Sequence, residues 1–136
     1  MDFSFCRKVS ALLPLLLAVS LSNQTAACAQ NKLPFSQTQA GMNETAGKNF
    51  ARADAEMNQA YKKLIAALKP QSQARLRESQ RQWLKFRDAE TKFLSSAFEG
   101  GSAYPMVFSG HKAGLTRHRT KELTETYKNF SDAGMV

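Results

Sequence analysis

The residues best equipped for chemistry lie in one short run, Trp83 to Glu90, which reads Trp-Leu-Lys-Phe-Arg-Asp-Ala-Glu. In a helix, Arg87 lies one turn after Trp83, so its guanidinium group can stack on the indole ring. Asp88 and Glu90 are two positions apart and point to different sides of a helix, so they make a poor pair for acid–base catalysis. The run therefore predicts a structural cluster rather than an active site.

Glu90 falls on the apolar stripe of its helix, where an unpaired carboxylate would be costly to bury. Either Arg117 or Arg119, further along the chain, is the expected partner. Such a pair would hold two helices together without taking part in a reaction. The expected cluster of ion pairs and stacked rings consists of Trp83, Arg87, Asp88, Glu90 and Arg119.

We expect neither a metal site nor a cofactor site. His111 and His118 are separated by two helical turns, which is too far for a compact pair of zinc ligands. Gly100-Gly101 follows a predicted helix rather than a strand, so this pair is interpreted as a helix stop and not as a phosphate-binding loop. The sequence thus favours a protein that is not an enzyme.

The first 29 residues predict a cleavable signal peptide. A short positive region precedes an apolar run of about 13 residues, which is too short to span a bilayer as a helix. Ala27-Cys28-Ala29 fits a signal-peptidase cut after Ala29, which would deliver the protein to the periplasm or the exterior. Processing as a lipoprotein at Cys28, which would attach the chain to a membrane, is less favoured because Thr25 replaces the branched apolar residue usual there.

Cleavage after residue 29 would change the composition. The full chain has 19 Lys and Arg, 11 Asp and Glu, and a formal net charge of +8. Residues 30–136 keep 17 basic and 10 acidic residues, a net charge of +7, but both cysteines, Cys6 and Cys28, are lost. We therefore expect one basic domain that has no disulfide and is stabilised by packing alone.

Apolar residues recur every three or four positions from Thr38 onward, which indicates helices. Residues 30–37 are polar and contain a proline, so they are expected to form an extended lead-in. Ser36 or Thr38 is expected to cap the first helix. Pro70 is expected to end it, because the residue before a proline is disfavoured in helical conformation.

Two short connections separate three predicted helices. Ser72 is the expected N-cap of the second helix, and Gly100-Gly101 ends it. Ser102 is expected to cap the third helix, with Pro105 in its first turn. Short connections favour antiparallel neighbours, so residues 38–131 predict an all-α, up-down-up bundle of three helices.

The apolar stripe of the second helix is expected to face the core. This stripe consists of residues at helical spacing, and most of them are aromatic residues or leucines. Its members are Leu76, Trp83, Phe86, Phe93 and Ala97, widened by Leu84, Leu94 and Phe98.

Several strings, taken in order, resemble the LprI-type lysozyme-inhibitor domain of exported bacterial proteins. The resemblance covers nearly all of the chain after residue 29, and the string from Gln80 to Glu90 is its most specific part. It implies a helical, non-enzymatic domain, which in some members inhibits host lysozyme. The strings are QAGMN (39–43), ADAEMNQAY (53–61), QRQWLKFRDAE (80–90), GGS (100–102), YPM (104–106) and LTRHRT (115–120).

The chain departs from the family pattern at three positions. The resemblance implies cysteines where this sequence has Thr45, Thr91 and His111. A disulfide of the family would therefore be missing here, and each such bridge is typically worth about 2–4 kcal/mol. The apolar stripes are intact, so the expected fold is the same.

The first functional hypothesis is an exported binding domain that blocks a lysozyme. An inhibitor needs a protruding element that enters the cleft of the enzyme, and the predicted turn before Tyr104 is the best candidate because an aromatic side chain is a rigid anchor. The net charge of +7 is unfavourable toward lysozymes that are themselves basic. The candidate binding residues are Glu99, Gly100, Gly101, Ser102 and Tyr104.

The alternative hypothesis is a basic protein of the cell envelope that binds an anionic cell-wall polymer or a lipid surface. Seven basic residues gather around the first connection and predict a positive end of the bundle. Few aromatic residues interleave with them, so nucleic acid is a less favoured partner. These residues are Lys62, Lys63, Lys69, Arg75, Arg77, Arg81 and Lys85.

Overall fold

The computed structural model describes residues 34–134, and within them the protein is a bundle of three helices with no strand. α1 spans Gln39–Ala67, α2 spans Pro70–Ser95 and α3 spans Tyr104–Asp132. The predicted all-α, up-down-up architecture is confirmed. The predicted signal peptide lies outside the described residues. None of the helices described is both long and apolar enough to cross a membrane.

The first helix begins as predicted at Thr38, whose Oγ1 accepts a hydrogen bond from the backbone N–H of Gly41 at 3.1 Å. The expectation of an extended lead-in is wrong for Phe35–Gln37, which form a 3₁₀ turn (η1) that folds back on the helix. A Cβ atom on Gly41 would lie 1.8 Å from the carbonyl oxygen of Phe35. Only glycine therefore allows this close approach of the two backbones.

The connection between α1 and α2 is shorter than expected. α1 ends at Ala67, with Leu68 at the C-cap position, and α2 begins at Pro70, with Lys69 at the N-cap position. The prediction that Ser72 caps α2 is wrong because the fixed φ of proline suits the first position of a helix, so the helix starts three residues earlier, at Pro70. The proline thus both stops one helix and starts the next.

The connection between α2 and α3 begins with a second 3₁₀ turn, η2, over Ser96–Phe98. Gly100 then adopts a φ of 78°, the left-handed conformation expected of a glycine that stops a helical segment, although α2 itself already ends at Ser95, earlier than predicted. Ser102 does not cap α3; Ala103 occupies the N-cap position and makes no side-chain cap. Pro105 lies in the first turn of α3, as predicted.

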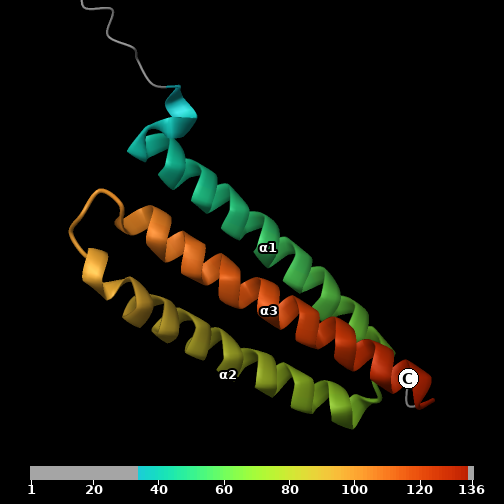
Figure 1. Ribbon diagram of the computed structural model, residues 1–136. Coiled ribbons are helices and arrows are strands. Elements are labelled where there is room, and N and C mark those ends of the chain that lie inside the picture. Colours follow the sequence, from blue (N-terminus) through green and yellow to red (C-terminus); the bar gives the residue numbers. More distant parts are fainter. Residues whose placement is uncertain (1–33, 135–136) are drawn as a thin grey trace, which may run out of the picture. The chain divides into compact units, whose positions relative to one another are not determined.

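The apolar core lies between the second half of α1, the first half of α2 and the second half of α3 (Figure 1). α3 packs closely against α1 and less closely against α2. The buried members of the apolar core are Met57, Leu64, Leu68 and Leu123. In the other half of the bundle the buried side chains are small, Ala53, Thr91, Ser95, Ala113 and Thr116, except for Arg87.

The face that α2 turns toward the core differs from the prediction. The side chains of Phe86 and Phe93 are 54% and 71% exposed, and Leu94 and Phe98 are exposed as well. The buried positions are instead Gln80, Arg87, Thr91 and Ser95, although Leu76, Trp83 and Leu84 still pack against the core. The predicted aromatic stripe of α2 therefore faces solvent along most of its length.

Buried hydroxyl groups allow this polar face to pack. Thr91 donates a hydrogen bond to the carbonyl oxygen of Arg87 at 2.7 Å, and Ser95 donates one to that of Thr91 at 2.7 Å. Because each hydroxyl is satisfied within its own helix, it can be buried without a partner on another helix. Thr91 is fully buried, whereas His111 is exposed.

Candidate functional site

The centre of the bundle is a polar cluster built around Arg87, which is only 6% exposed. One of its terminal nitrogens lies 3.1 Å from Oδ1 of Asp54 on α1, and its Nε lies 3.0 Å from Oδ1 of Asp88. Its guanidinium group also lies 5.6 Å from the centre of the Phe50 ring. Arg87 thus connects α2 to α1 through a carboxylate and an aromatic ring.

Lys112 extends the cluster to α3. Its Nζ lies 3.1 Å from Oδ1 of Asp88 and 5.0 Å from the centre of the Phe50 ring. Partial burial by itself would raise the pKa of Asp88, but hydrogen bonds from Lys112 and Arg87 outweigh it and hold that pKa below its usual value. Asp88 therefore stays ionised at neutral pH and joins two cations from two helices.

Trp83 lies between two arginines. The guanidinium carbon atoms of Arg87 and Arg119 are 5.5 Å and 5.7 Å from its ring. Arg87 therefore stacks on Trp83, as the sequence predicts. Arg119, from α3, also donates to Oε1 of Gln80 at 3.1 Å and pairs with Glu122 at 2.9 Å.

The expected partnership of Glu90 is wrong. Within residues 34–134 Glu90 makes no ion pair, and Arg119 instead binds groups on its own helix and on α2. Glu90 is half-buried beside the exposed stripe, so it stays in contact with water and needs no counter-charge. The buried charge that does need partners is Arg87, and Asp54, Phe50 and Lys112 are the partners that sequence reasoning missed.

The polar cluster has the properties of a structural element. Among the described residues, every buried side-chain nitrogen or oxygen has a hydrogen-bond partner. No group of three or more metal-binding side chains occurs in residues 34–134. His118 is exposed and lies 3.2 Å from Glu122, one turn away, and His111 is exposed on the same helix.

The α2–α3 turn, Glu99–Ser102, is the most exposed connection of the bundle, and all four of its residues are exposed. Its base is held by hydrogen bonds from the N–H groups of Gly101 and Tyr104 to the carbonyl oxygens of Phe98 and Gly101, at 3.0 and 3.1 Å. Nδ2 of Asn43 on α1 donates to the carbonyl oxygen of Ser102 at 3.0 Å. The turn is therefore exposed at its tip and fixed at its base.

Tyr104 does not project from the turn as an isolated anchor. Its side chain is half-buried and packs on Phe108, with ring centres 5.6 Å apart. The exposed aromatic groups near the turn are Phe98, which is 46% exposed, and Phe93 on the last turns of α2. Both phenylalanines are more exposed than Tyr104 and lie on the segment that leads into the turn.

Charge is distributed unevenly between the two halves of the bundle. The half that carries the α2–α3 turn, residues 38–53 and 86–116, holds five Lys or Arg and four Asp or Glu. The basic end, residues 54–85 and 117–134, holds eleven Lys or Arg and six Asp or Glu. The turn and the positive surface therefore lie at opposite ends (Figure 1).

Comparison with known proteins identifies relatives of the chain. Residues 23–123 match the family described as Lysozyme inhibitor LprI. An uncharacterized protein of Rhizobium meliloti (strain 1021) is 33% identical over 101 residues, which cover 65% of this chain and 73% of that protein. No solved structure matches the chain significantly.

Proposed function

Since the chain belongs to the LprI lysozyme-inhibitor family, we propose that it is an exported, non-enzymatic domain that binds a lysozyme through its α2–α3 turn. The observation that carries this proposal is the exposed turn, fixed at its base and flanked by Phe93 and Phe98. A fixed turn loses little conformational entropy on binding. Exposed aromatic side chains are the groups that contribute most to protein interfaces.

The distribution of charge removes the main objection to this partner. The net charge of +7 on residues 30–136 would repel a basic lysozyme if it were spread evenly. The half of the bundle that carries the turn has nearly balanced charges, and the turn itself contributes only the carboxylate of Glu99. The excess positive charge lies at the far end, where screening by salt weakens its effect on a contact at the turn.

Substitutions in the turn are expected to weaken inhibition. In a turbidity assay with a c-type lysozyme and bacterial cell walls, the protein should inhibit at micromolar concentration. Phe98→Ala should raise the inhibition constant at least about tenfold, because truncation of an interface anchor costs roughly 2 kcal/mol or more. Glu99→Gln should raise it less, through a slower association.

A matched control is available on the same helix. Phe86 is also an exposed phenylalanine but lies three turns before Phe98, so Phe86→Ala should leave the inhibition constant within about twofold if the contact is local. Equal effects of Phe86→Ala and Phe98→Ala would contradict a site at the turn. Absence of inhibition by the unaltered protein would remove lysozymes of this type as partners.

The export predicted from the first 29 residues has a direct test. Intact-mass measurement of protein recovered from the cell envelope should give a chain that begins at Gln30 and carries no lipid. Replacing the small residue at the cut, Ala29→Asp, should leave the precursor uncleaved, whereas Cys28→Ser should change nothing. A mature form that begins at an acylated Cys28 would show instead that the protein is a lipoprotein.

A further inference from the structure

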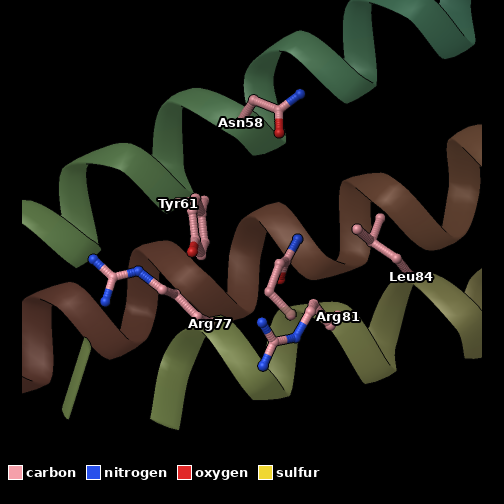
Figure 2. A pocket seen from close by; sticks show the side chains of 6 residues that line it. Asn58, Tyr61, Arg77, Arg81 and Leu84 are labelled. Carbon is pink, nitrogen blue, oxygen red and sulfur yellow. The ribbon is translucent and has the colours of Figure 1, made fainter. Parts of the chain in front are cut away.

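A pocket of about 320 Å³ lies between α1 and α2, and Figure 2 shows the side chains that line it. Its lining residues belong to the basic end, which lies opposite the α2–α3 turn (Figure 1). The size of the pocket falls near the lower limit of small-molecule sites, which suits a ligand of one or two sugar units. Figure 2 shows Tyr61 extending from α1 toward α2, whose side chains form the opposite side. The lining residues are Asn58, Tyr61, Arg77, Gln80, Arg81 and Leu84.

The lining is rich in hydrogen-bond donors and contains no carboxylate. Arg77 uses one terminal nitrogen to bind Oε1 of Gln73 at 3.2 Å. Arg81 binds the carboxylate of Glu78 through its Nε and one terminal nitrogen. A guanidinium group has five N–H donors in a planar fork, so both arginines keep donors for a further acceptor.

The charge around the pocket favours an anion. Hydrogen bonds from Arg81 and Gln82 lower the pKa of Glu78, so this carboxylate is ionised and offsets the charge of Arg81. In residues 34–134 Arg77 pairs with no carboxylate, and its contact with Gln73 leaves its charge uncompensated. The surrounding basic end adds a positive field, which is strongest for an anion bound within a concave site.

The pocket also has an apolar wall. The ring of Tyr61 is half-buried, and Leu84 lies across from it on α2. An aromatic ring beside polar donors is suited to a ligand with one flat, weakly polar face and hydroxyl groups at its edge. Nδ2 of Asn58 donates to Oδ2 of Asp54 at 3.1 Å, and the second N–H and Oδ1 of this amide can donate to and accept from such hydroxyl groups.

We propose that this pocket binds an acidic saccharide, a sugar ring that bears a carboxylate. One of the two arginines would bind the carboxylate through paired N–H groups, the other would bind a further acceptor of the ligand, and the face of the sugar would lie on Tyr61. Inorganic phosphate satisfies only the arginines, and a flat lipid surface cannot enter a concave site. An acidic saccharide uses the cations, the amide and the ring together.

The proposal is tested with trigalacturonate as the acidic probe and maltotriose as a neutral probe of equal length. Isothermal titration should detect binding of trigalacturonate to the unaltered protein and none of maltotriose. The double variant Arg77→Gln/Arg81→Gln should weaken trigalacturonate binding at least about tenfold, because two charge-assisted contacts are lost. Equal binding of the two probes, or no binding of either, would overturn the proposal.

A charge-matched control separates the pocket from general attraction. Lys69→Gln/Lys128→Gln removes the same charge from the basic end but touches no lining residue, so binding should fall less than about threefold at physiological salt. Equal losses in the two double variants would show a nonspecific positive surface. Competition by inorganic phosphate at the concentration of the saccharide would show a simple anion site. If the protein bound vesicles of anionic phospholipid and Arg77→Gln/Arg81→Gln abolished that binding, the pocket would be a lipid headgroup site. Each of these three results would reject the saccharide as the ligand.

Discussion

Replacement of Arg87 by methionine is expected to lower the free energy of unfolding by about 2–3 kcal/mol. Methionine fills most of the same space, so the loss comes from the contacts with Asp54 and Asp88 and with the Phe50 ring. The effect stays below the ~3–5 kcal/mol of a fully buried pair because both carboxylates remain partly in water. Urea unfolding followed by circular dichroism measures the change.

The matched control is Arg81→Met, the same substitution at an exposed position of α2. It should change the free energy of unfolding by no more than about 0.5 kcal/mol. Similar losses for the two variants would mean that Arg87 contributes no more than a surface arginine. In that case the polar cluster would not be the element that holds the three helices together.

The pH dependence of the Arg87→Met effect has a defined sign. The pKa of Asp88 is lowered in the folded protein, so its contribution to stability is present at neutral pH and is lost as the pH falls through the folded pKa. Arg87 is one cause of that lowering. The difference between the unaltered protein and the variant should therefore begin to shrink near pH 4, the ordinary range of aspartate, and should continue to shrink below it.

The second large effect is expected at Leu123, which is 2% exposed and packs with Met57 and Leu64. Leu123→Ala should cost about 2–5 kcal/mol, because it removes buried apolar surface and leaves a cavity. Phe93→Ala removes a larger side chain, but Phe93 is 71% exposed, so the cost should stay within about 0.5 kcal/mol. Thermal and urea unfolding of both variants under the same conditions give the comparison.

The contrast between these two variants tests which face of α2 is buried. If Phe93→Ala were as destabilising as Leu123→Ala, the aromatic stripe would face the core, as periodicity alone predicts. The buried polar face seen in the structure would then be contradicted. A neutral Phe93→Ala together with a costly Leu123→Ala supports the observed orientation of the helix.

The number, order and approximate ends of the helices were predictable because they depend on local chemistry. Pro70, Thr38 and Gly100 act through the conformation of their own backbone or a nearby N–H group, and the structure has each in its expected role. Ser72 and Ser102 have the right side chains for caps but are not used. Proline had already started one helix, and Ala103 occupies the cap position of the other.

The orientation of α2 was not predictable from hydrophobic periodicity. The face of α2 that carries Phe86 and Phe93 is more hydrophobic than the opposite face, yet the opposite face is the one that is buried. Thr91 and Ser95 can be buried because their hydroxyl groups bind the carbonyl oxygens of their own helix. Arg87 can be buried because Asp54, 33 positions away, provides a counter-charge. The hydrophobic pattern of α2 alone reveals neither these hydroxyl hydrogen bonds nor the counter-charge on α1.

The candidate sites were predictable to different degrees. The glycine pair marked the α2–α3 turn, although Phe98 and not Tyr104 provides its exposed aromatic group. The run of basic residues marked the basic end as a positive surface. The pocket at that end was missed because it requires Tyr61 on α1 to face Arg77 on α2, and the sequence gives no signal for that pairing.

The polar cluster has a consequence for the alignment of the helices along their axes. Apolar packing has no preferred direction, so a small core such as this one would tolerate a slide of α2 by one helical turn, about 5.4 Å. Such a slide would separate Arg87 from Asp54 and Lys112 from Asp88, leaving charged groups without partners. The cluster therefore selects a single axial register, and with it the position of every residue that α2 contributes to the two ends of the molecule.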